Sequence, residues 1–365
     1  MTFTIDKDIF TNLLGMASRF TSNRLSSITS LQGILLRSEK DTLNLYATNL
    51  TTFFRTSIQI PGLEKTEVVI EPKKMLEFLT FLPSGELAVE IKDKQIILKM
   101  KKTRGNFPLI IAPDFPLPPG FPHAAKPIDT DVFSKELPLV LFSASSDDTR
   151  PVLTGINFHT ADGELKLVAT DGFRLSVVQD KNLGTFPSMI VPADFLNEVL
   201  RYMKEAKEVK FNHFPDEKIV SFEADSHVFY SRLIEGDYPP FARVIPTEVK
   251  TTIVTNRNEL QRNIKLISVF ARDFSNVVVM EVSPDGLTLR PKKEGNAENT
   301  AFQEAEIDGE SMAVAFNFKF VLDVLNHIEG DDVIIELLRP DAPAVFKTKK
   351  NSGFLHVIMP VRIQE

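Results

Sequence analysis

The sequence predicts an α+β protein built from three copies of one domain, because several patterns recur along it. The first is a strand-like stretch rich in leucine, which reads DTLNLYAT at 41–48, GELKLVATDGFRL at 163–175 and DGLTLRPK at 285–292. Its equivalent leucines are separated by a constant 122 residues, at Leu43, Leu165 and Leu287. A repeat of this length corresponds to a whole domain, since solenoid units have only about 20–50 residues.

Two further patterns return at similar offsets. IDKDIF at 5–10 recurs as IDTDVF at 128–133, and a weaker counterpart opens at 258–260. A short strand followed by an amphipathic helix is expected three times, at VVIEPKKMLEFL (68–79), MIVPADFLNEVL (189–200) and AVAFNFKFVLDVL (313–325). Each copy therefore reads as helix, strands, helix, strands.

Proline-rich segments separate the three copies. Residues 112–127 hold six prolines in sixteen positions, too many for a packed element. The segment DYPPFARVIP at 237–246 marks the approach to the second boundary. We expect domains at 1–126, 127–250 and 251–365, each close to the commonest domain size of about 100–150 residues.

Composition narrows the class of protein. Hydrophobic residues make up 43% and charged residues 25% of the chain, which is ordinary for a soluble globular protein. The absence of cysteine excludes disulfides and thiolate metal sites. The first residues do not form a signal peptide, and no apolar run approaches the roughly 18 residues of a membrane span. These features predict a cytoplasmic protein that does not enter a membrane.

Individual elements can be placed from their hydrophobic periodicity. A helix over 4–20 should bury the side that carries Phe10, Leu13, Ala17 and Phe20. A short helix over 72–82 carries Lys73 and Lys74. Alternating runs between and after these helices predict strands with one buried face. Pro138 falls inside the first helix of the second copy, where a proline should kink or restart it.

The helix predicted at 257–272 has two distinct faces at about 100° per residue. One is apolar and consists of Leu260, Ile264, Ile267 and Ala271, and the other is polar and basic and consists of Asn258, Arg262, Lys265 and Arg272. A similar stripe in the second copy contains Asn197, Arg201 and Lys204, diluted by Glu198 and Glu205. Charged stripes are usually solvated helix faces. Because the basic stripe recurs in different copies, the sequence favours the alternative, in which the helices of several copies together form one continuous basic surface.

The net charge of −7 argues, taken alone, against a nucleic-acid partner. An acidic protein can nevertheless be basic on one selected face, so the distribution of charge matters more than its sum.

Motifs for catalysis or metal binding are missing. The sequence contains no glycine-rich phosphate loop, no GxSxG and no HExxH. Its six histidines show no i, i+4 pairing, so neither a metal site nor a cofactor is expected. Asp171 and Arg174 could form a catalytic pair, but a tight Asp-Gly turn at the end of a strand is the favoured interpretation. We therefore do not expect an enzyme.

Four motifs resemble the bacterial sliding clamp family, the beta subunits of the replicative DNA polymerase III. They are DDTRPVLTGINF from Asp147, VATDGFRL from Val168, LIEGDYPPFARVIP from Leu233 and VIMPVRI ending at Ile363. With the triplicated organisation, the resemblance covers essentially the whole chain. It implies three clamp domains, each with two helices packed on antiparallel sheets. Two chains would join head to tail as a homodimer that forms a six-domain ring.

The same resemblance implies a processivity factor that encircles double-stranded DNA without reading its sequence. Its partners would be the catalytic subunit of the replicative polymerase, the clamp loader and other proteins with a clamp-binding motif. A partner inserts a peptide with glutamine and bulky apolar residues into a cleft between the second and third domains. The matching positions are Leu153, Thr170, Gly172, Phe173, Arg174, Leu175, Pro239, Arg243, Val244, Asn317, Phe320, Val357, Met359, Pro360, Val361 and Arg362.

The resemblance also implies DNA-contacting and interface residues. The cations expected to face DNA are Arg24, Lys73, Lys74, Arg201, Lys204, Arg262, Lys265 and Arg272. The ring joint would contain Phe107, Leu109, Phe270 and Ala271, with Pro108 interrupting the hydrogen bonding of its strand.

The chain departs from the family pattern at three places. Phe173 replaces the usual His or Tyr. Asp147 stands where a related clamp has a DNA-contacting Gln, so it is not assigned to DNA. Gln364 and Glu365 extend past the usual end and could shade the cleft.

Two alternatives to a DNA-encircling clamp remain. One is a peptide-binding interaction scaffold of the same fold that is not loaded on DNA. The acidic residues within the basic stripe of the second copy and the acidic net charge are consistent with this alternative. The other is an enzyme, which the missing motifs disfavour.

Overall fold

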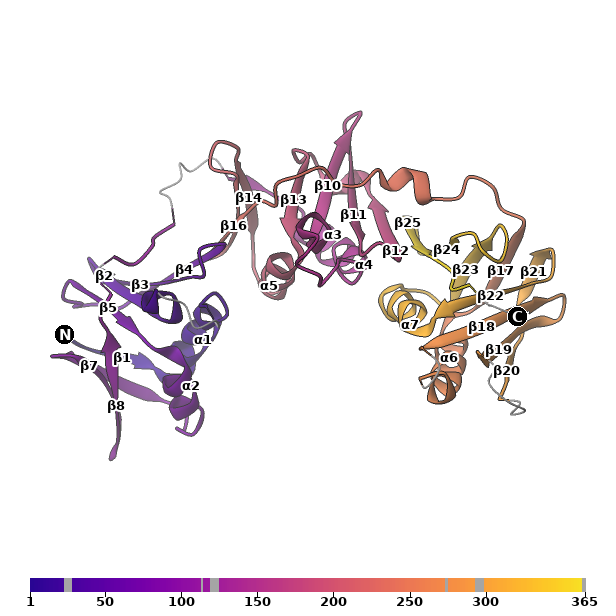
Figure 1. The fold of residues 1–365 in the computed structure, drawn as a ribbon. Helices are drawn as coiled ribbons and strands as arrows, with labels where there is room; N and C mark the ends of the chain where they lie inside the picture. The colour runs from indigo at the N-terminus through magenta and orange to yellow at the C-terminus, as the bar shows by residue number, and fades with distance from the viewer. Residues whose placement is uncertain (23–27, 113, 119–124, 273–274, 293–298, 363–365) are drawn as a thin grey trace. The chain divides into compact units, whose positions relative to one another are not determined.

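A computed structural model describes residues 1–22, 28–112, 114–118, 125–272, 275–292 and 299–362 (Figure 1). Its contacts group the chain into two compact units. The first contains Met1–Thr130 and Glu198–Leu233, and the second contains Asp131–Asn197 and Ile234–Glu365. The division falls within helix α5 (Ala193–Met203), so the middle repeat contributes to both units.

The first unit is built on one antiparallel sheet whose strand order is β1-β6-β7-β8-β5-β2-β3-β4-β16-β15-β14-β9. Its strands from the first repeat are β1 (Thr2–Asp6), β2 (Ile34–Glu39), β3 (Thr42–Thr48), β4 (Thr52–Gln59), β5 (Thr66–Ile70), β6 (Glu86–Lys92), β7 (Gln95–Met100) and β8 (Thr103–Ile110). Those that follow are β9 (Lys126–Pro127), β14 (Val209–Phe214), β15 (Ile219–Ala224) and β16 (His227–Arg232). Helices α1 (Lys7–Ser18) and α2 (Pro72–Thr80) pack against each other.

The second unit contains two antiparallel sheets. The larger has the order β13 (Met189–Pro192), β10 (Gly155–Ala161), β11 (Glu164–Thr170), β12 (Arg174–Gln179), β25 (Asn351–Ile358), β24 (Ala344–Thr348), β23 (Asp332–Leu337), β17 (Thr251–Asn256) and β21 (Glu306–Gly309). The smaller has the order β20 (Ala301–Gln303), β19 (Gly286–Pro291), β18 (Val277–Ser283) and β22 (Met312–Asn317). The helices are α3 (Thr130–Glu136), α4 (Pro138–Leu141), α6 (Arg257–Ala271) and α7 (Phe318–His327).

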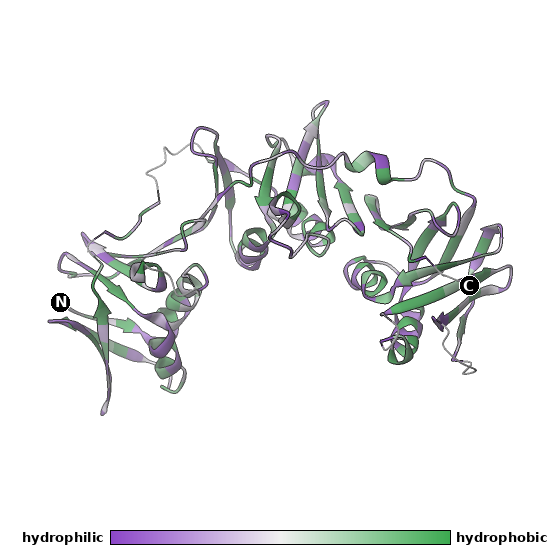
Figure 2. Ribbon diagram, viewed as in Figure 1, coloured by the Kyte–Doolittle hydropathy of each residue, from purple (hydrophilic) through white to green (hydrophobic). Residues whose placement is uncertain are grey.

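The predicted repeat is confirmed by equivalent elements. Leu43, Leu165 and Leu287 are buried in β3, β11 and β19, and each of these strands pairs with the preceding strand of its own repeat. The expected pairs of strand and amphipathic helix are β5 with α2, β13 with α5, and β22 with α7. Strand β18, an inner strand of the smaller sheet, is largely green in Figure 2 because most of its residues are apolar, and most of them are also buried.

The first helix starts later than predicted. Residues 2–6 form strand β1, which pairs with β6, and the helix begins at Lys7 rather than at residue 4. The reason is that the Asp6 carboxylate accepts hydrogen bonds from the backbone N–H groups of Asp8 and Ile9, which fixes the helix start. The predicted apolar side is confirmed, since Phe10, Leu13, Ala17 and Phe20 are all buried.

Pro138 divides the first helix of the middle repeat, as predicted. Helix α3 ends at Glu136 and α4 begins at Pro138, which therefore occupies the first turn of a new helix. A proline is tolerated there because its missing N–H would have no partner in the first turn.

An aromatic cluster joins strands of the first and middle repeats in the first unit. Phe54 on β4 lies opposite Phe229 on β16, and their ring centroids are 5.2 Å apart. Phe20 stacks on the Phe54 ring at 5.2 Å. All three rings are fully or almost fully buried. This cluster supplies core packing where the two repeats share a sheet.

Replacing Phe54 by Ala is expected to lower the free energy of unfolding of this unit by about 3–5 kcal/mol, because a buried ring is lost and a cavity remains. Urea denaturation followed by circular dichroism measures the change. Phe173→Ala is the control, since that ring is 60% exposed and its loss should change stability by less than about 0.5 kcal/mol. Equal effects of the two substitutions would contradict the assignment of Phe54 to the core.

Candidate peptide-binding cleft

An apolar cavity of about 550 Å³ lies in the second unit, beside the turn between β11 and β12. It is lined by Arg150, Leu153, Thr170, Gly172, Phe173, Arg174, Leu175, Pro239, Pro240, Phe241, Arg243, Val244, Val357 and Met359. Most of the predicted cleft positions are thus brought together, although they come from distant parts of the sequence. The volume is in the range of ligand-binding pockets, about 300–1,000 Å³.

The floor of the cavity depends on strands from two repeats. Leu175 on β12 lies opposite Val357 on β25, and both are buried in one apolar cluster with Val168, Val177 and Val345. The Met359 N–H donates a hydrogen bond of 2.9 Å to the Phe173 carbonyl. Backbone pairing therefore holds the two walls at a fixed separation, while the Phe173 and Met359 side chains are 60% and 39% exposed.

The turn at 171–173 forms one wall and is organised by Asp171. Its carboxylate accepts hydrogen bonds from the N–H groups of Phe173 at 2.8 Å and Arg174 at 3.0 Å. Gly172 has φ +92°, and a Cβ at this position would lie 3.2 Å from Nη1 of Arg150. These contacts support the turn interpretation of Asp171 and Arg174 over a catalytic pair.

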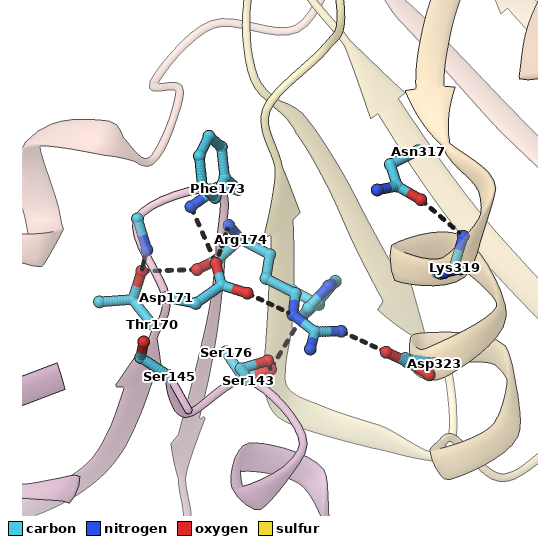
Figure 3. A network of polar contacts seen from close by, with 12 residues as sticks. Ser143, Ser145, Thr170, Asp171, Phe173, Arg174, Ser176, Asn317, Lys319 and Asp323 are labelled. Atoms are coloured by element: carbon cyan, nitrogen blue, oxygen red, sulfur yellow. Dashed lines mark hydrogen bonds and ion pairs between the residues drawn. The ribbon is translucent and has the colours of Figure 1, made fainter. Parts of the chain in front are cut away.

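Arg174 lies between two carboxylates (Figure 3). Its Nε donates to Oδ2 of Asp171 at 3.0 Å, and its Nη1 donates to Oδ2 of Asp323 on α7 at 2.5 Å. The guanidinium also lies over the Phe320 ring, 4.7 Å from the centroid. Only 11% of the Arg174 side chain is exposed, so most of its hydrogen-bonding capacity is already directed at the protein.

Five predicted positions do not line the cavity. Asn317 caps α7 by accepting a hydrogen bond from the Lys319 N–H, and Phe320 lies beneath Arg174. Val361 packs against the cluster of Val277, Val279 and Ala315. Pro360 is half-buried and Arg362 is exposed, both outside the cavity lining. Gln364 and Glu365 lie outside the described residues.

Three lining residues were not predicted. Arg150 belongs to the motif DDTRPVLTGINF, and Pro240 and Phe241 belong to DYPPFARVIP. They could have been predicted as cleft residues because they belong to these two motifs. Phe241 opens the short 3₁₀ helix η4 (Phe241–Val244), which forms a wall together with the predicted cleft residues Arg243 and Val244.

A buried polar chain runs below the cleft. Nδ1 of His356 lies 2.8 Å from Oγ of Ser176, which lies 2.7 Å from Oγ of Ser143. Burial, with the nearby positive charge of Arg174 and the neighbouring His327, holds the pKa of His356 well below its ordinary value. The imidazole is therefore neutral in the folded protein at neutral pH.

The predicted DNA-facing cations are exposed wherever the structure describes them. Lys73 and Lys74 lie on α2, and Arg201 and Lys204 lie at the end of α5. On α6 the exposed cations are Arg262, Lys265 and Arg272, the last at its C-terminal cap, and the predicted apolar face is buried. Glu198 lies 3.6 Å from Arg201, and Glu259 lies 3.3 Å from Arg262. Arg24 lies outside the described residues.

The predicted interface residues differ in exposure. Phe107 and Leu109 on β8 are half-buried, and the Phe107 ring makes an edge contact with Phe78. Phe270 on α6 is 43% exposed, but the methyl group of Ala271 is fully buried on the inner face of that helix. Two further apolar side chains on α6, Leu266 and Val269, are 55% and 61% exposed and were not predicted.

No group of three or more metal-ligating side chains occurs within the part of the chain that the structure describes. In those same ranges, no helix has the length and apolar character needed to cross a membrane.

Three repeats of antiparallel strands and helices, with exposed lysine and arginine side chains on α2, α5 and α6, correspond to the architecture of a sliding clamp. Family profiles of the DNA polymerase III beta subunit match along the chain, with the N-terminal domain at 1–119, the central domain at 127–240 and the C-terminal domain at 242–362. The chain therefore belongs to the DNA polymerase III beta subunit family, whose members are non-catalytic subunits of the polymerase.

Individual relatives agree with this assignment. The beta sliding clamp of Caulobacter vibrioides is 26% identical over 100% of both chains, and that of Bacillus subtilis is 26% identical over 99% of this chain and 100% of its own. The solved sliding clamp of Bacillus subtilis superimposes with a TM-score of 0.90 at 25% identity, covering 100% of both chains. The DNA polymerase III beta subunit of Thermotoga maritima gives a TM-score of 0.91 at 22% identity, again over 100% of both.

The depressed pKa of His356 predicts that stability decreases in mild acid. Below about pH 6.5 the unfolded chain binds a proton at this histidine while the folded protein does not, so the unfolded state is favoured as the pH falls. The contribution is at most about 1.4 kcal/mol per pH unit. Urea denaturation between pH 5 and 7 should therefore show a smaller slope for His356→Asn, which can keep the contact with Ser176. An unchanged slope would contradict a neutral buried imidazole.

Proposed function

We propose that two copies of this chain close into a ring around duplex DNA and tether the replicative polymerase and other DNA-processing proteins through the cleft. The observation that carries the proposal is the separation of charge on the helices. Lys73, Lys74, Arg201, Lys204, Arg262, Lys265 and Arg272 are exposed on helix faces or helix ends of a chain whose net charge is −7. In an otherwise acidic protein, cations concentrated on helix faces and helix ends can bind the phosphate backbone of DNA.

Contacts of this type hold DNA without reading its bases, which permits sliding. A polymerase bound to a ring around the template then stays near its substrate after each release, because tethering raises its effective concentration. The domain boundaries near 126 and 250 and action in the cytoplasm, where a clamp loader would open the ring, belong to the same proposal.

Ring closure is supported by unpaired edges and exposed apolar groups. Along residues 103–108, β8 pairs with β7 on one side, and its pairing with β5 is confined to Leu109 and Ile110. Strand β20 is the edge of the smaller sheet and exposes Phe302 at 54%. Two such edges can pair across a dimer interface and hide each other. We place Phe107, Leu109, Phe270 and Ala271 at this joint. Because Ala271 is buried, it would contribute only by positioning its exposed neighbours on α6.

The cleft supports the tethering role. Its floor is apolar, and the flexible side chain of Met359 can adapt to different ligands. The sliding clamp of Bartonella birtlesii, which shares this fold, was solved bound to griselimycin. Asn317, Phe320, Pro360, Val361 and Arg362 lie outside the cavity lining and would contribute to the cleft only at its margin.

Loading on circular DNA tests the ring directly. Labelled protein is loaded onto nicked circular duplex by a clamp loader and passed through a gel-filtration column, before and after the DNA is linearised. A closed ring is expected to stay with the circle and to be lost from the linear form. Equal retention on both forms, or no retention on either, would contradict encirclement and favour a peptide-binding scaffold that is not loaded on DNA.

The triple substitution Arg201→Ala, Arg262→Ala and Lys265→Ala tests the cationic faces. The slope of log K against log salt should fall by about 0.9 for each phosphate contact removed. Fluorescence anisotropy with a short duplex at several salt concentrations gives this slope. Lys65→Ala, Arg339→Ala and Lys349→Ala together are the control, since they remove the same charge from other exposed positions. If both triple variants behave alike, these helix faces do not contact DNA.

Met359→Ala should weaken binding of a partner peptide roughly tenfold or more, because an adaptable apolar wall is removed from the cleft. Isothermal titration calorimetry measures the affinity, and gel filtration checks that the dimer persists. Met312→Ala serves as the control, since Met312 is half-buried on β22 and outside the cavity lining. An unaltered affinity for the Met359 variant would place the peptide elsewhere.

A further inference from the structure

We propose that Arg19 is a further phosphate-contacting residue and that Glu198 limits its contact with DNA, because this carboxylate holds Arg19 and Arg201 in one shared ion pair. The proposal rests on the proposed function, since it specifies how one part of the cationic surface meets DNA. The family resemblance gave neither Arg19 nor Glu198 a role. All three residues belong to the first unit.

The carboxylate of Glu198 joins helices from two repeats. Nη1 of Arg19, at the C-terminal cap of α1, lies 3.5 and 3.4 Å from its two oxygens. On α5 itself, Nε of Arg201 lies 3.6 Å from Oε1 of the same carboxylate. Two guanidiniums thus share one carboxylate, and the group carries one net positive charge instead of two.

Aromatic packing fixes the two arginines relative to each other. Arg19 is followed by Phe20, whose ring centroid lies 5.7 Å from that of Phe229. Arg201 is followed by Tyr202, which stacks on the same Phe229 ring at 5.2 Å. Burial raises the pKa of Tyr202, so its phenol is neutral at neutral pH and adds no charge to the group. The core therefore keeps the arginines close together even when the ion pair is broken.

The ion pair is weak enough for a phosphate to replace the carboxylate. All three nitrogen–oxygen distances exceed the roughly 2.7–2.9 Å of strong charge-assisted hydrogen bonds. The side chains of Arg19 and Arg201 are 44% and 57% exposed, whereas that of Glu198 is 24% exposed. A phosphate that arrives from solvent therefore meets the guanidiniums first. Exposed ion pairs contribute little stability, so this exchange costs the fold little.

A similar carboxylate on α6 has a smaller reach. Oε1 of Glu259 lies 3.3 Å from Nη2 of Arg262, with the same spacing of three residues that separates Glu198 from Arg201. Glu259 and Arg262 lie on one helix, whereas Glu198 also contacts Arg19 on another. Removal of the Glu198 carboxylate should therefore free two arginines at once.

Two explanations of Glu198 can be separated by experiment. As a general negative charge, it would weaken DNA binding to the same extent whether or not Arg19 is present. If it acts by holding Arg19, the effects of the two residues depend on each other.

A double-mutant cycle with the full-length protein measures this dependence. Fluorescence anisotropy with a short labelled duplex at several salt concentrations gives the slope of log K against log salt for each variant. Glu198→Gln should steepen the slope by about 0.9, the value of one further phosphate contact. Arg19→Ala should remove about 0.9 from the slope of the Glu198→Gln protein, and less than about half of that from the slope of wild type.

Glu67 and Arg37 provide the matched control, since they form an ion pair at 2.9 Å between strands β5 and β2 of the same unit. Glu67→Gln and Arg37→Ala, alone and together, should leave the slope unchanged. Glu198→Ala removes the same carboxylate and replaces Glu198→Gln if circular dichroism shows that the Gln variant does not fold. Arg19→Lys keeps the charge and should retain the steeper slope when combined with Glu198→Gln.

Equal effects of Arg19→Ala in wild type and in Glu198→Gln would overturn the proposal. This holds even if Glu198→Gln strengthens binding, because a general charge effect gives that result as well. Failure of the proposed function is distinguishable, since the triple substitution of Arg201, Arg262 and Lys265 would then leave the salt slope unchanged.

Discussion

Antiparallel pairing between strands of different repeats is the constraint on which both units depend. In the first unit β4 pairs with β16, and in the second β12 pairs with β25. Each pairing satisfies backbone groups that would otherwise lie at a sheet edge, so the middle repeat is joined to both of its neighbours. This explains why contacts divide the middle repeat between two units although the sequence repeats three times.

The second of these pairings also builds the cleft. Its register places Arg174 opposite Ile358 and Leu175 opposite Val357, which brings the turn at 171–173 next to Met359. A slip of one residue would turn every side chain of β25 to the other face of the sheet. The cavity floor would then lose Val357. The position of the cleft therefore follows from strand register.

Sequence periodicity predicted the repeated elements because their apolar positions must face a core. Leu43, Leu165 and Leu287 could be aligned for this reason, and Pro138 marked a helix break through its own chemistry. The start of the first helix was misplaced because the capping by Asp6 overrides an apolar pattern that continues into β1. Pairing across repeats, and the burial of Ala271 next to exposed Phe270, depend on tertiary packing and have no local signature.

The candidate cleft was predicted mainly through family motifs, since its residues are separated by up to about two hundred positions and no local pattern joins them. Periodicity alone would assign Leu175 and Val357 to an ordinary core, which is correct for their burial. What distinguishes the site is the charged group at its margin. Asp171 lies near Arg174 in sequence, whereas Asp323 comes from a helix almost 150 residues away, and only the fold brings them together.

That arrangement separates two tasks within one small region. Under the proposed function, the backbone-paired floor provides an apolar surface whose affinity for a peptide would depend on fit and burial rather than on charge. The Arg174 guanidinium provides a fixed electrostatic environment. It is held by carboxylates from the β11–β12 turn and from α7, and it lies over the rings of Phe142 and Phe320. Under the proposed function, such a surface would vary its apolar contacts with different partners through Phe173 and Met359, which are 60% and 39% exposed. Substitutions at these exposed walls need not disturb the ion pairs of Arg174 with Asp171 and Asp323.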